Sequence, residues 1–286
     1  TYPVRLVPFP SYRGGVAGVE EFATTVRGLQ TRRTSRLWWG GVKLVLDGSI
    51  QGWTAQLSWP GYRTRGHDGW WGLSPETVPD VVHALHAAGL QIHAHCNGDL
   101  TSGLFIDAVG AALDRTPRWD HRHTVTHGQL TTPAQYRRMR ALGMGVNLFS
   151  NHLFYWGDQH AALTVGPERA RGMNAAATAL REGVPFTLHS DAPVTPLGGL
   201  HLMWCAVNRL TASGEVLGEH ERIGVHDALR AITLGGAYLL KLDHLIGSLE
   251  AGKFADFAVL GEDPYEVDPR SLRDIPVLAT AVGGEI

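Results

Sequence analysis

Several short apolar runs of this chain end in a polar side chain, and this pattern restricts the fold more than any other feature. Gln91–His95 and His123–His127 end in histidine, Gly183–Asp191 ends in aspartate, and Gly41–Gly48 carries Lys43 where an apolar residue is expected. Strands that place polar groups at their carboxyl ends, one after another, are typical of the active site of a (β/α) barrel. The pattern therefore predicts such a barrel.

The order of the expected elements supports the same fold class. Strands are expected at 2–9, 37–46, 90–95, 121–127, 145–149 and 184–190, and helices at 74–88, 101–115, 132–142, 174–181, 200–211 and 226–240. Strands separated by helices pair in parallel through right-handed crossovers. A closed barrel needs eight strands and about 250 residues. We therefore expect an α/β fold, a (β/α)8 TIM-type barrel of which about the last six strands are present.

The final part of the chain has a different pattern of expected secondary structure. Residues 246–260 and 275–282 read as short strands joined by turns, with no helical pattern between them. We expect residues 1–245 to be the C-terminal portion of the barrel. Residues 246–286 are expected to be strands of a small β-sandwich that packs beside it.

Composition excludes several classes of protein. The net charge is −2 with no basic stripe, which argues against a nucleic-acid partner. No apolar run reaches the ~20 residues of a membrane helix, and the start does not resemble a signal peptide, so a cytoplasmic location is expected. The two cysteines, Cys96 and Cys205, exclude a disulfide framework and a thiolate zinc site.

Four side chains near the carboxyl ends of different strands form the candidate site: Lys43, His95, His127 and Asp191. Two neutral imidazoles and a carboxylate suit a divalent ion, most often zinc, which activates water for attack. Asp191 is expected to ligate the metal and to act as general base and then acid. Lys43, as a carbamate, is able to bridge two ions, so the site is expected to hold one or two.

Strand alternation alone leaves the choice of histidine open. His93 lies on the same face of its strand as His95, and His121 and His123 share a face with His127. His127 is preferred because it lies nearest the carboxyl end of its strand. A lone histidine at the end of a strand is more often a core or loop residue than a ligand, so the prediction depends on the joint pattern.

Other residues have simpler interpretations. Asp47 and Asp99 are weaker candidates, because turn chemistry alone explains them. Lys43 on its own suggests a snorkelling lysine, or a Schiff-base amine in an enzyme without metal. The expected loops carry aromatic residues that either line a pocket or pack the loops onto the barrel: Trp53, Trp70, Trp71, Phe154, Tyr155 and Trp156. No substrate-binding residue is assigned.

Five blocks, in the correct order, resemble the amidohydrolase superfamily. The similarity is to its branch of N-substituted formamide deformylase and exoenzyme-regulatory-protein-like metal-dependent hydrolases. The blocks are Val42–Ser49, His95–Asp99, Arg122–Leu130, Leu188–Pro193 and the tail Ile246–Asp256, with Thr126 where the branch more often has Glu. They cover nearly the whole chain, so the resemblance is specific.

The resemblance implies a role for each candidate. Lys43 is implied to be the carboxylated bridging lysine, His95 and His127 ligands of the second metal, and Asp191 a ligand and proton shuttle. The resemblance also selects His95 over His93. The family's first strand ends in His-x-His, and no such pair lies upstream of Lys43. We therefore expect an N-terminal segment or separate chain to complete the barrel.

The expected activity is hydrolysis of a C–N bond, an amide or related linkage, in a small-molecule substrate. Zinc is the expected metal. The alternative is a catalytically inactive barrel that binds a small molecule or acts in regulation, and the missing His-x-His supports it. Activity of this portion alone is not expected, and assembly as a homo-oligomer stays open.

Overall fold

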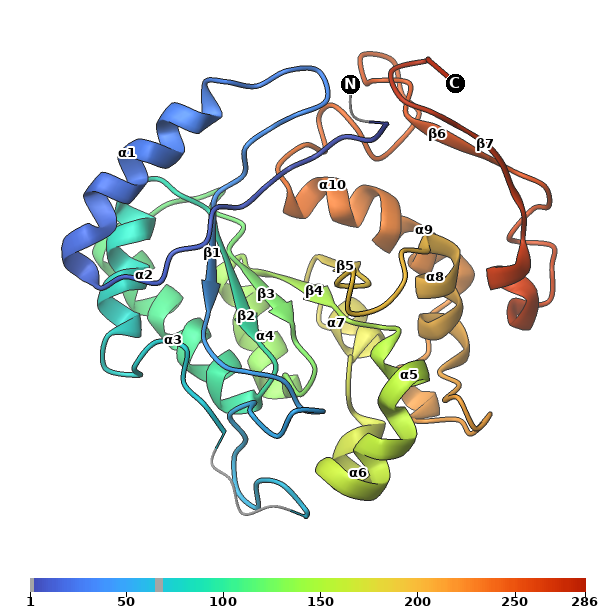
Figure 1. Ribbon diagram of the computed structural model, residues 1–286, viewed down its shortest axis with the longest axis horizontal. Helices are drawn as coiled ribbons and strands as arrows, with labels where there is room; N and C mark the ends of the chain where they lie inside the picture. The colour runs from blue at the N-terminus through green and yellow to red at the C-terminus, as the bar shows by residue number, and fades with distance from the viewer. Residues whose placement is uncertain (1–2, 65–68) are drawn as a thin grey trace.

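The centre of the molecule is a curved parallel sheet of five strands (Figure 1). The computed structural model describes residues 3–64 and 69–286. The strands are β1 (Val42–Val45), β2 (Ile92–Cys96), β3 (Thr124–His127), β4 (Gly145–Leu148) and β5 (Phe186–Leu188). Each strand pairs in parallel with the next in the sequence. This arrangement confirms the predicted α/β fold, an incomplete TIM-type barrel.

Helices lie around the outside of the sheet (Figure 1). They are α1 (Val19–Gln30), α2 (Val78–Ala87), α3 (Asp99–Arg115), α4 (Pro133–Leu142), α5 (His152–Gln159), α6 (Gly166–Arg171), α7 (Ala176–Arg181), α8 (Gly199–Asn208), α9 (Val225–Arg230) and α10 (Gly236–Leu239). Two π-helical turns span His160–Thr164 and Ala231–Gly235, and 3-10 turns span Val16–Gly18, Glu219–Glu221 and Pro269–Asp274. The main core lies between the outer face of the sheet and these helices, with Leu44, Ile92 and Val146 fully buried.

The first predicted strand, 2–9, is wrong as a regular strand; its Tyr2 lies outside the described residues. The chain does run beside β1, where Leu6 forms an isolated parallel bridge to Leu37 and Ser11 forms one to Lys43. Prolines at positions 3, 8 and 10 have no N–H to donate, and this interrupts the ladder. The sheet in the described part of the chain therefore has five strands rather than six.

The sequence patterns at helix ends predicted some helix boundaries correctly and others incorrectly. Thr132 forms the capping box with Gln135, and the left-handed Gly143 ends α4, which begins and ends within a residue of the prediction. The helix expected over 74–88 begins later, at Val78, and the Ser74 hydroxyl hydrogen-bonds that of Thr77 in the turn before it. Helices α1, α5 and α6 were not predicted.

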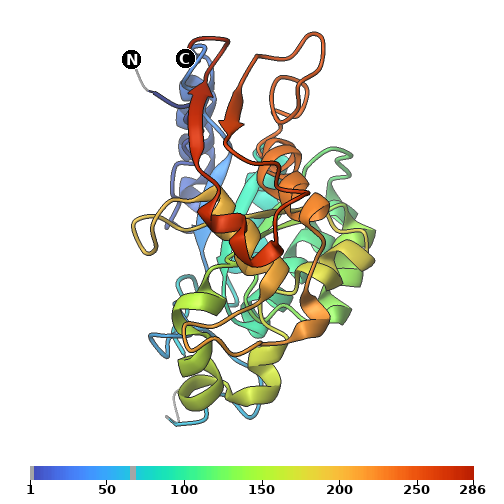
Figure 2. The same cartoon turned by 90° about the vertical axis from the view of Figure 1, so that its right-hand side faces the viewer.

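The C-terminal part contains an antiparallel pair, β6 (Phe257–Leu260) and β7 (Val277–Ala281), seen in red in Figure 2. Residues 246–260 were expected to form short strands joined by turns, and only their last four residues form a strand. Ion pairs Arg5–Asp256 and Arg36–Glu285 join this part to the start of the chain. The division at residue 246 stays a prediction. Among the described residues, every helix is too short or too polar to span a bilayer.

Candidate metal centre

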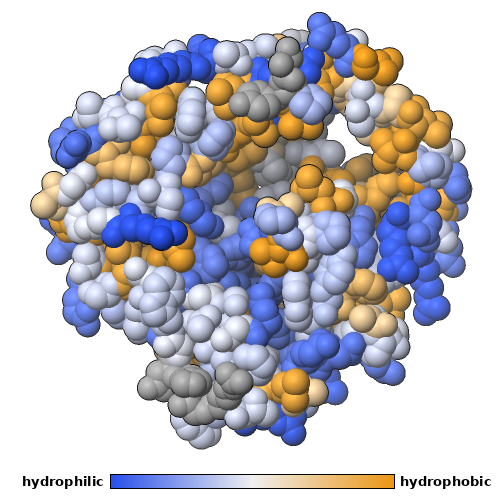
Figure 3. Space-filling model, in the orientation of Figure 1, coloured by the Kyte–Doolittle hydropathy of each residue, from blue (hydrophilic) through white to orange (hydrophobic). Residues whose placement is uncertain are grey.

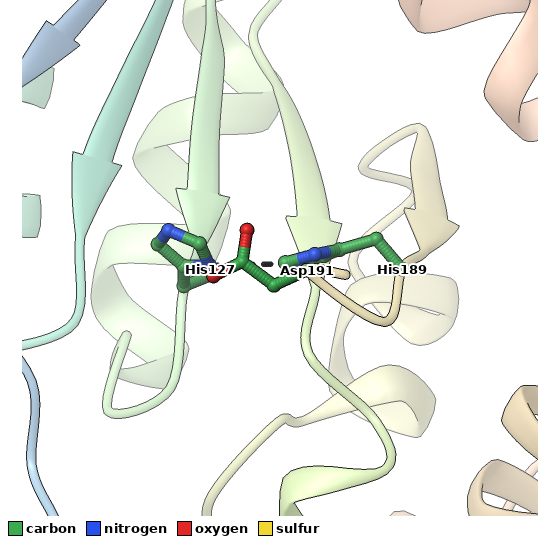
Figure 4. A group of neighbouring side chains, drawn as sticks. All are labelled: His127, His189 and Asp191. Atoms are coloured by element: carbon green, nitrogen blue, oxygen red, sulfur yellow. Dashed lines mark hydrogen bonds between the residues drawn. The ribbon is translucent and has the colours of Figure 1, made fainter. Parts of the chain in front are cut away.

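Three side chains meet at the carboxyl ends of β3 and β5: His127, His189 and Asp191 (Figure 4). One nitrogen of each ring and one oxygen of the carboxyl group all lie within 4.8 Å of one another. His127 Nδ1 and His189 Nε2 are 3.3 Å apart. The space-filling view shows the molecule hollowed in the middle of the face drawn in Figure 1 (Figure 3).

The backbone is in the left-handed region at two of these positions. The φ angle is 78° at His127 and 54° at Asp191, values that residues other than glycine seldom adopt. Strand alternation would place His127 on the same side as Val125, which is packed in the core under the helices. The left-handed turn brings the His127 ring to the inner side instead, beside His95. Unusual backbone of this kind is concentrated at functional sites.

His95 joins the group through His127. His95 Nδ1 and His127 Nε2 are 2.9 Å apart, and the rings meet edge to face. On its other side, His95 Nε2 lies 2.8 Å from the carbonyl oxygen of Gly48. A histidine ligand commonly donates its second ring N–H to such a carbonyl, which fixes the tautomer and the ring orientation. This contact therefore leaves Nδ1 of His95 directed into the centre.

Lys43 belongs to the same neighbourhood. It lies on β1 beside His93 in register, two residues before the position that pairs with His95. Burial lowers the pKa of Lys43 to about 8, although the nearby Asp191 carboxylate opposes the shift. The structure thus brings together all four predicted residues: Lys43, His95, His127 and Asp191.

The electrostatics of the centre favour neutral imidazoles. Burial, reinforced by the charge of Lys43, lowers the pKa of His95 to about 4 and that of His189 to about 3. Burial also lowers the pKa of His127 well below its usual value, with the neighbouring His95 as the next contribution. Burial raises the pKa of Asp191, and Lys43 opposes it. Neutral rings offer the lone pairs that a metal ion requires.

The structure also separates the histidines that alternation left open. His93 Nε2 lies 3.2 Å from the carbonyl oxygen of Leu239, and its ring packs on Phe9. His121 and His123 lie on the outer side of β3, where His123 Nε2 is 2.8 Å from His86 Nδ1. Their ring nitrogens are taken up by hydrogen bonds in that network.

The two weaker carboxylates support loops. Asp47 is fully buried and accepts hydrogen bonds from the N–H groups of Gln56, Asn97 and Gly98 and from the Thr101 hydroxyl. Asp99 accepts from Ser58 N–H and pairs with Arg169 at 3.0 Å. Asp47 therefore holds the loop that follows His95, and Asp99 ties two more distant loops together.

His189 is the residue of the centre that the sequence analysis missed. It lies in the block Leu188–Pro193 but was not proposed as a ligand. The signal was available: His189 directly follows β5 and stands two residues before Asp191, the same spacing that separates His93 and His95 on β2.

The residues present fit a divalent ion. Imidazole nitrogens and a carboxylate oxygen converge within bonding reach of one small volume, and such a donor set suits zinc and similar metals. With this centre at the carboxyl ends of parallel barrel strands, the fold and site define a class: an amidohydrolase-type barrel with a candidate metal centre.

Comparison with known proteins agrees with this class. The chain matches the amidohydrolase family over residues 1–286 and belongs to that family. It is 31% identical over 252 residues to the protein LONG AFTER FAR-RED 3 of Arabidopsis thaliana, covering 87% of this chain and 43% of that protein. It is 28% identical over 211 residues to N-substituted formamide deformylase of Arthrobacter pascens, covering 74% and 39%. The predicted family is thus confirmed.

Solved structures show the same fold. A metal-dependent hydrolase from Pyrococcus horikoshii superposes with a TM-score of 0.76 at 22% identity, covering 93% of this chain and 52% of the other. One from Pyrococcus furiosus gives a TM-score of 0.75 at 23% identity, covering 92% and 51%. The chain spans about half the length of the proteins it matches.

Proposed function

We propose that the protein is a metal-dependent hydrolase that cleaves a C–N bond of a small molecule, an amide or a related linkage. The observation that carries the proposal is the convergence of His127, His189 and Asp191 at the carboxyl ends of β3 and β5. Membership of the amidohydrolase family supports it. One relative is an N-substituted formamide deformylase, and N-substituted formamides are therefore the first substrate class to try.

The roles of the residues follow from their positions. His95 and His127, with His189 or Asp191 beside them, would hold the metal, which we propose to be zinc. When bound, the metal supplies a water of lowered pKa and polarises the substrate carbonyl. Lys43 is buried, and its lowered pKa makes the free amine more available for carboxylation. We propose the carboxylated form as a further ligand.

Asp191 is the proposed proton shuttle. Asp191 is an exposed residue, whereas His127 is buried. The turn bond from Val194 N–H is accepted by the Asp191 backbone carbonyl, so the carboxyl group is not needed to form that turn. A carboxylate so placed is able to take a proton from the attacking water and to pass it to the leaving nitrogen.

Completion of the barrel is part of the proposal. The strands present leave the sheet open beyond β5, and the upstream His-x-His pair of the family is absent from this sequence. We propose that an N-terminal segment or chain supplies the remaining strands and ligands. A cytoplasmic location stays a prediction.

The experiment compares metal content and hydrolysis in the full-length protein and its variants. Asp191→Asn is expected to lose activity toward N-substituted formamides by about a hundredfold or more, because the general base is absent, and to hold its metal less tightly, because Asp191 is also a proposed ligand. Lys43→Ala is expected to bind less metal. Asp158→Asn is a matched control on the surface of α5, and it should leave both properties unchanged.

Unchanged hydrolysis in Asp191→Asn would remove the proposed proton role. Tight metal binding without hydrolysis of formamides, other amides or cyclic amides would favour the catalytically inactive alternative.

A further inference from the structure

A second polar cluster lies next to the metal centre, behind the ring of Phe149. Phe149 stacks on His189 with ring centroids 4.7 Å apart, and its ring centroid lies 3.3 Å from that of His152. His152 begins α5 and is 1% exposed. Its ring centroid is 6.4 Å from that of His160, which is fully buried. The cluster thus shares one aromatic wall with the site.

Three polar atoms of this cluster are buried without a hydrogen-bond partner in the described part of the chain: His152 Nε2, His160 Nε2 and Gln129 Oε1. Gln129 Nε2 hydrogen-bonds His152 Nδ1, which ties the amide to the ring. A buried polar atom left without a partner destabilises the fold. Three together indicate that something polar is bound there in the working protein.

The hydrogen-bonding roles of the three atoms can be worked out. Thr164 donates its hydroxyl hydrogen to His160 O, so His160 Nδ1 donates to that hydroxyl and Nε2 is an acceptor. With the Gln129 amide as placed, Oε1 is an acceptor and His152 Nε2–H a donor. Turning the amide over makes Gln129 Nε2 the donor and His152 Nε2 an acceptor. Both assignments leave two acceptors and one donor group.

We propose that His152, His160 and Gln129 form a subsite that binds a primary carboxamide group of the substrate. Such a group offers one carbonyl acceptor and two N–H donors, which complements the two acceptors and one donor of the cluster. This inference rests on the proposed function, because it places the carboxamide one aromatic ring away from the bond to be cleaved.

The surroundings favour an uncharged ligand. The electrostatic influences on His152 come from His160 and His189, and burial alone accounts for the lowered pKa of His160. Within residues 3–64 and 69–286, no Asp, Glu, Lys or Arg side chain contributes to the pKa shift of either ring. A carboxylate or ammonium group would lie buried there without a counter-charge, and this is strongly unfavourable.

Two further features of the backbone fit a binding role. His160 opens the π-helical turn His160–Thr164, and such turns are frequent at functional sites. Asn174 donates its backbone N–H to Gln129 O and adopts a φ of 50°. Trp156, which is part-exposed, lies edge-on against His152 with ring centroids 4.5 Å apart.

The test uses the full-length protein labelled with ¹⁵N-histidine and titrated with acetamide. The ring nitrogens of His152 and His160 are expected to shift and saturate. His86 and His121 are internal controls and should not move, because hydrogen bonds already take up their ring nitrogens. Acetate, with the same shape and a charge, should produce no saturable shift at either ring.

A substitution at His160 tests whether acetamide binds at this cluster. His160→Phe is expected to weaken acetamide binding, read at His152, by about tenfold or more, because it removes one acceptor. His226→Phe makes the same exchange on α9, where the ring bonds Tyr265 at the surface, and should bind like the wild type.

Three results would overturn the proposal: no saturable shift in the wild type, equal binding of acetate, or shifts confined to His127 and His189. The first would mean that the cluster holds only water. Hydrolysis is not needed for this binding, so the outcome is separate from that of the proposed function. A protein without hydrolytic activity that binds acetamide at His152 would retain the subsite and lose the proposed reaction.

Discussion

Replacing Asp47 by asparagine is expected to change how the stability of the protein depends on pH. The Asp47 carboxyl group is fully buried and accepts four hydrogen bonds from the loops beside His95. Burial opposes its ionisation more than these hydrogen bonds favour it, and the pKa rises from 3.8 to about 6. Ionised Asp47 therefore destabilises the folded state relative to the unfolded chain.

The size of the effect follows from the shift. One pKa unit corresponds to about 1.4 kcal/mol, so a shift of about two units gives about 3 kcal/mol. A folded pKa above the unfolded value means that the folded state holds the proton more tightly. The contribution of Asp47 to stability is then full below pH ~4, is lost as the pH rises to ~6, and stays constant above.

The assay is urea unfolding of the wild type and Asp47→Asn at pH 4 and pH 7. Subtracting the two proteins removes the titration of all other groups, so the difference in unfolding free energy should change by about 3 kcal/mol in favour of the variant at pH 7. For Asp158→Asn, the difference in unfolding free energy should change with pH in the opposite direction. Hydrogen bonds from Thr211 and Ser213 together outweigh burial there and lower the pKa of Asp158. If the difference in unfolding free energy between Asp47→Asn and the wild type does not change with pH, or favours the wild type at pH 7, burial does not control the pKa of Asp47.

Three further changes test the local structure. Gly98→Ala places a Cβ 1.8 Å from the backbone oxygen of Gln56 and should destabilise the fold by about 3 kcal/mol, whereas Gly15→Ala, with nothing within 4 Å, should be nearly neutral in thermal melts. Thr132→Ala removes the side-chain cap of α4 and should lower the unfolding free energy by about 1 kcal/mol in urea. Burial lowers the pKa of His121 to about 4, so the unfolded chain takes up the proton first and stability should fall by up to about 3 kcal/mol between pH ~6.5 and ~4. A smaller fall in His121→Asn would support this account, and an equal fall would contradict it.

The sequence predicted the parallel strands well because each is a short apolar run bounded by turn residues. It predicted less about Pro3–Phe9, where hydropathy suggested a strand but the prolines leave too few donors for a ladder. Helix α5 was missed because its start, Asn151, makes no side-chain cap and three of its eight residues are aromatic: Phe154, Tyr155 and Trp156.

In the candidate site, too, the sequence predicted some residues and not others. His95 follows from strand order and resemblance, but its partner His127 reaches the centre only through a left-handed backbone that alternation does not predict. His189 was overlooked because its role depends on the ends of β3 and β5 meeting across β4, which lies between them in the sheet. The proposed subsite at His152 depends on which buried polar atoms lack a hydrogen-bond partner, and this cannot be predicted from the sequence.

The left-handed conformations of His127 and Asp191 have a consequence for how this fold tolerates change. Glycine would relax the backbone at both positions and would remove the reactive groups. Variants selected only for heat resistance should therefore drift toward small residues there and become inert. At His127 and Asp191, a substitution that stabilises the fold would therefore also abolish the activity.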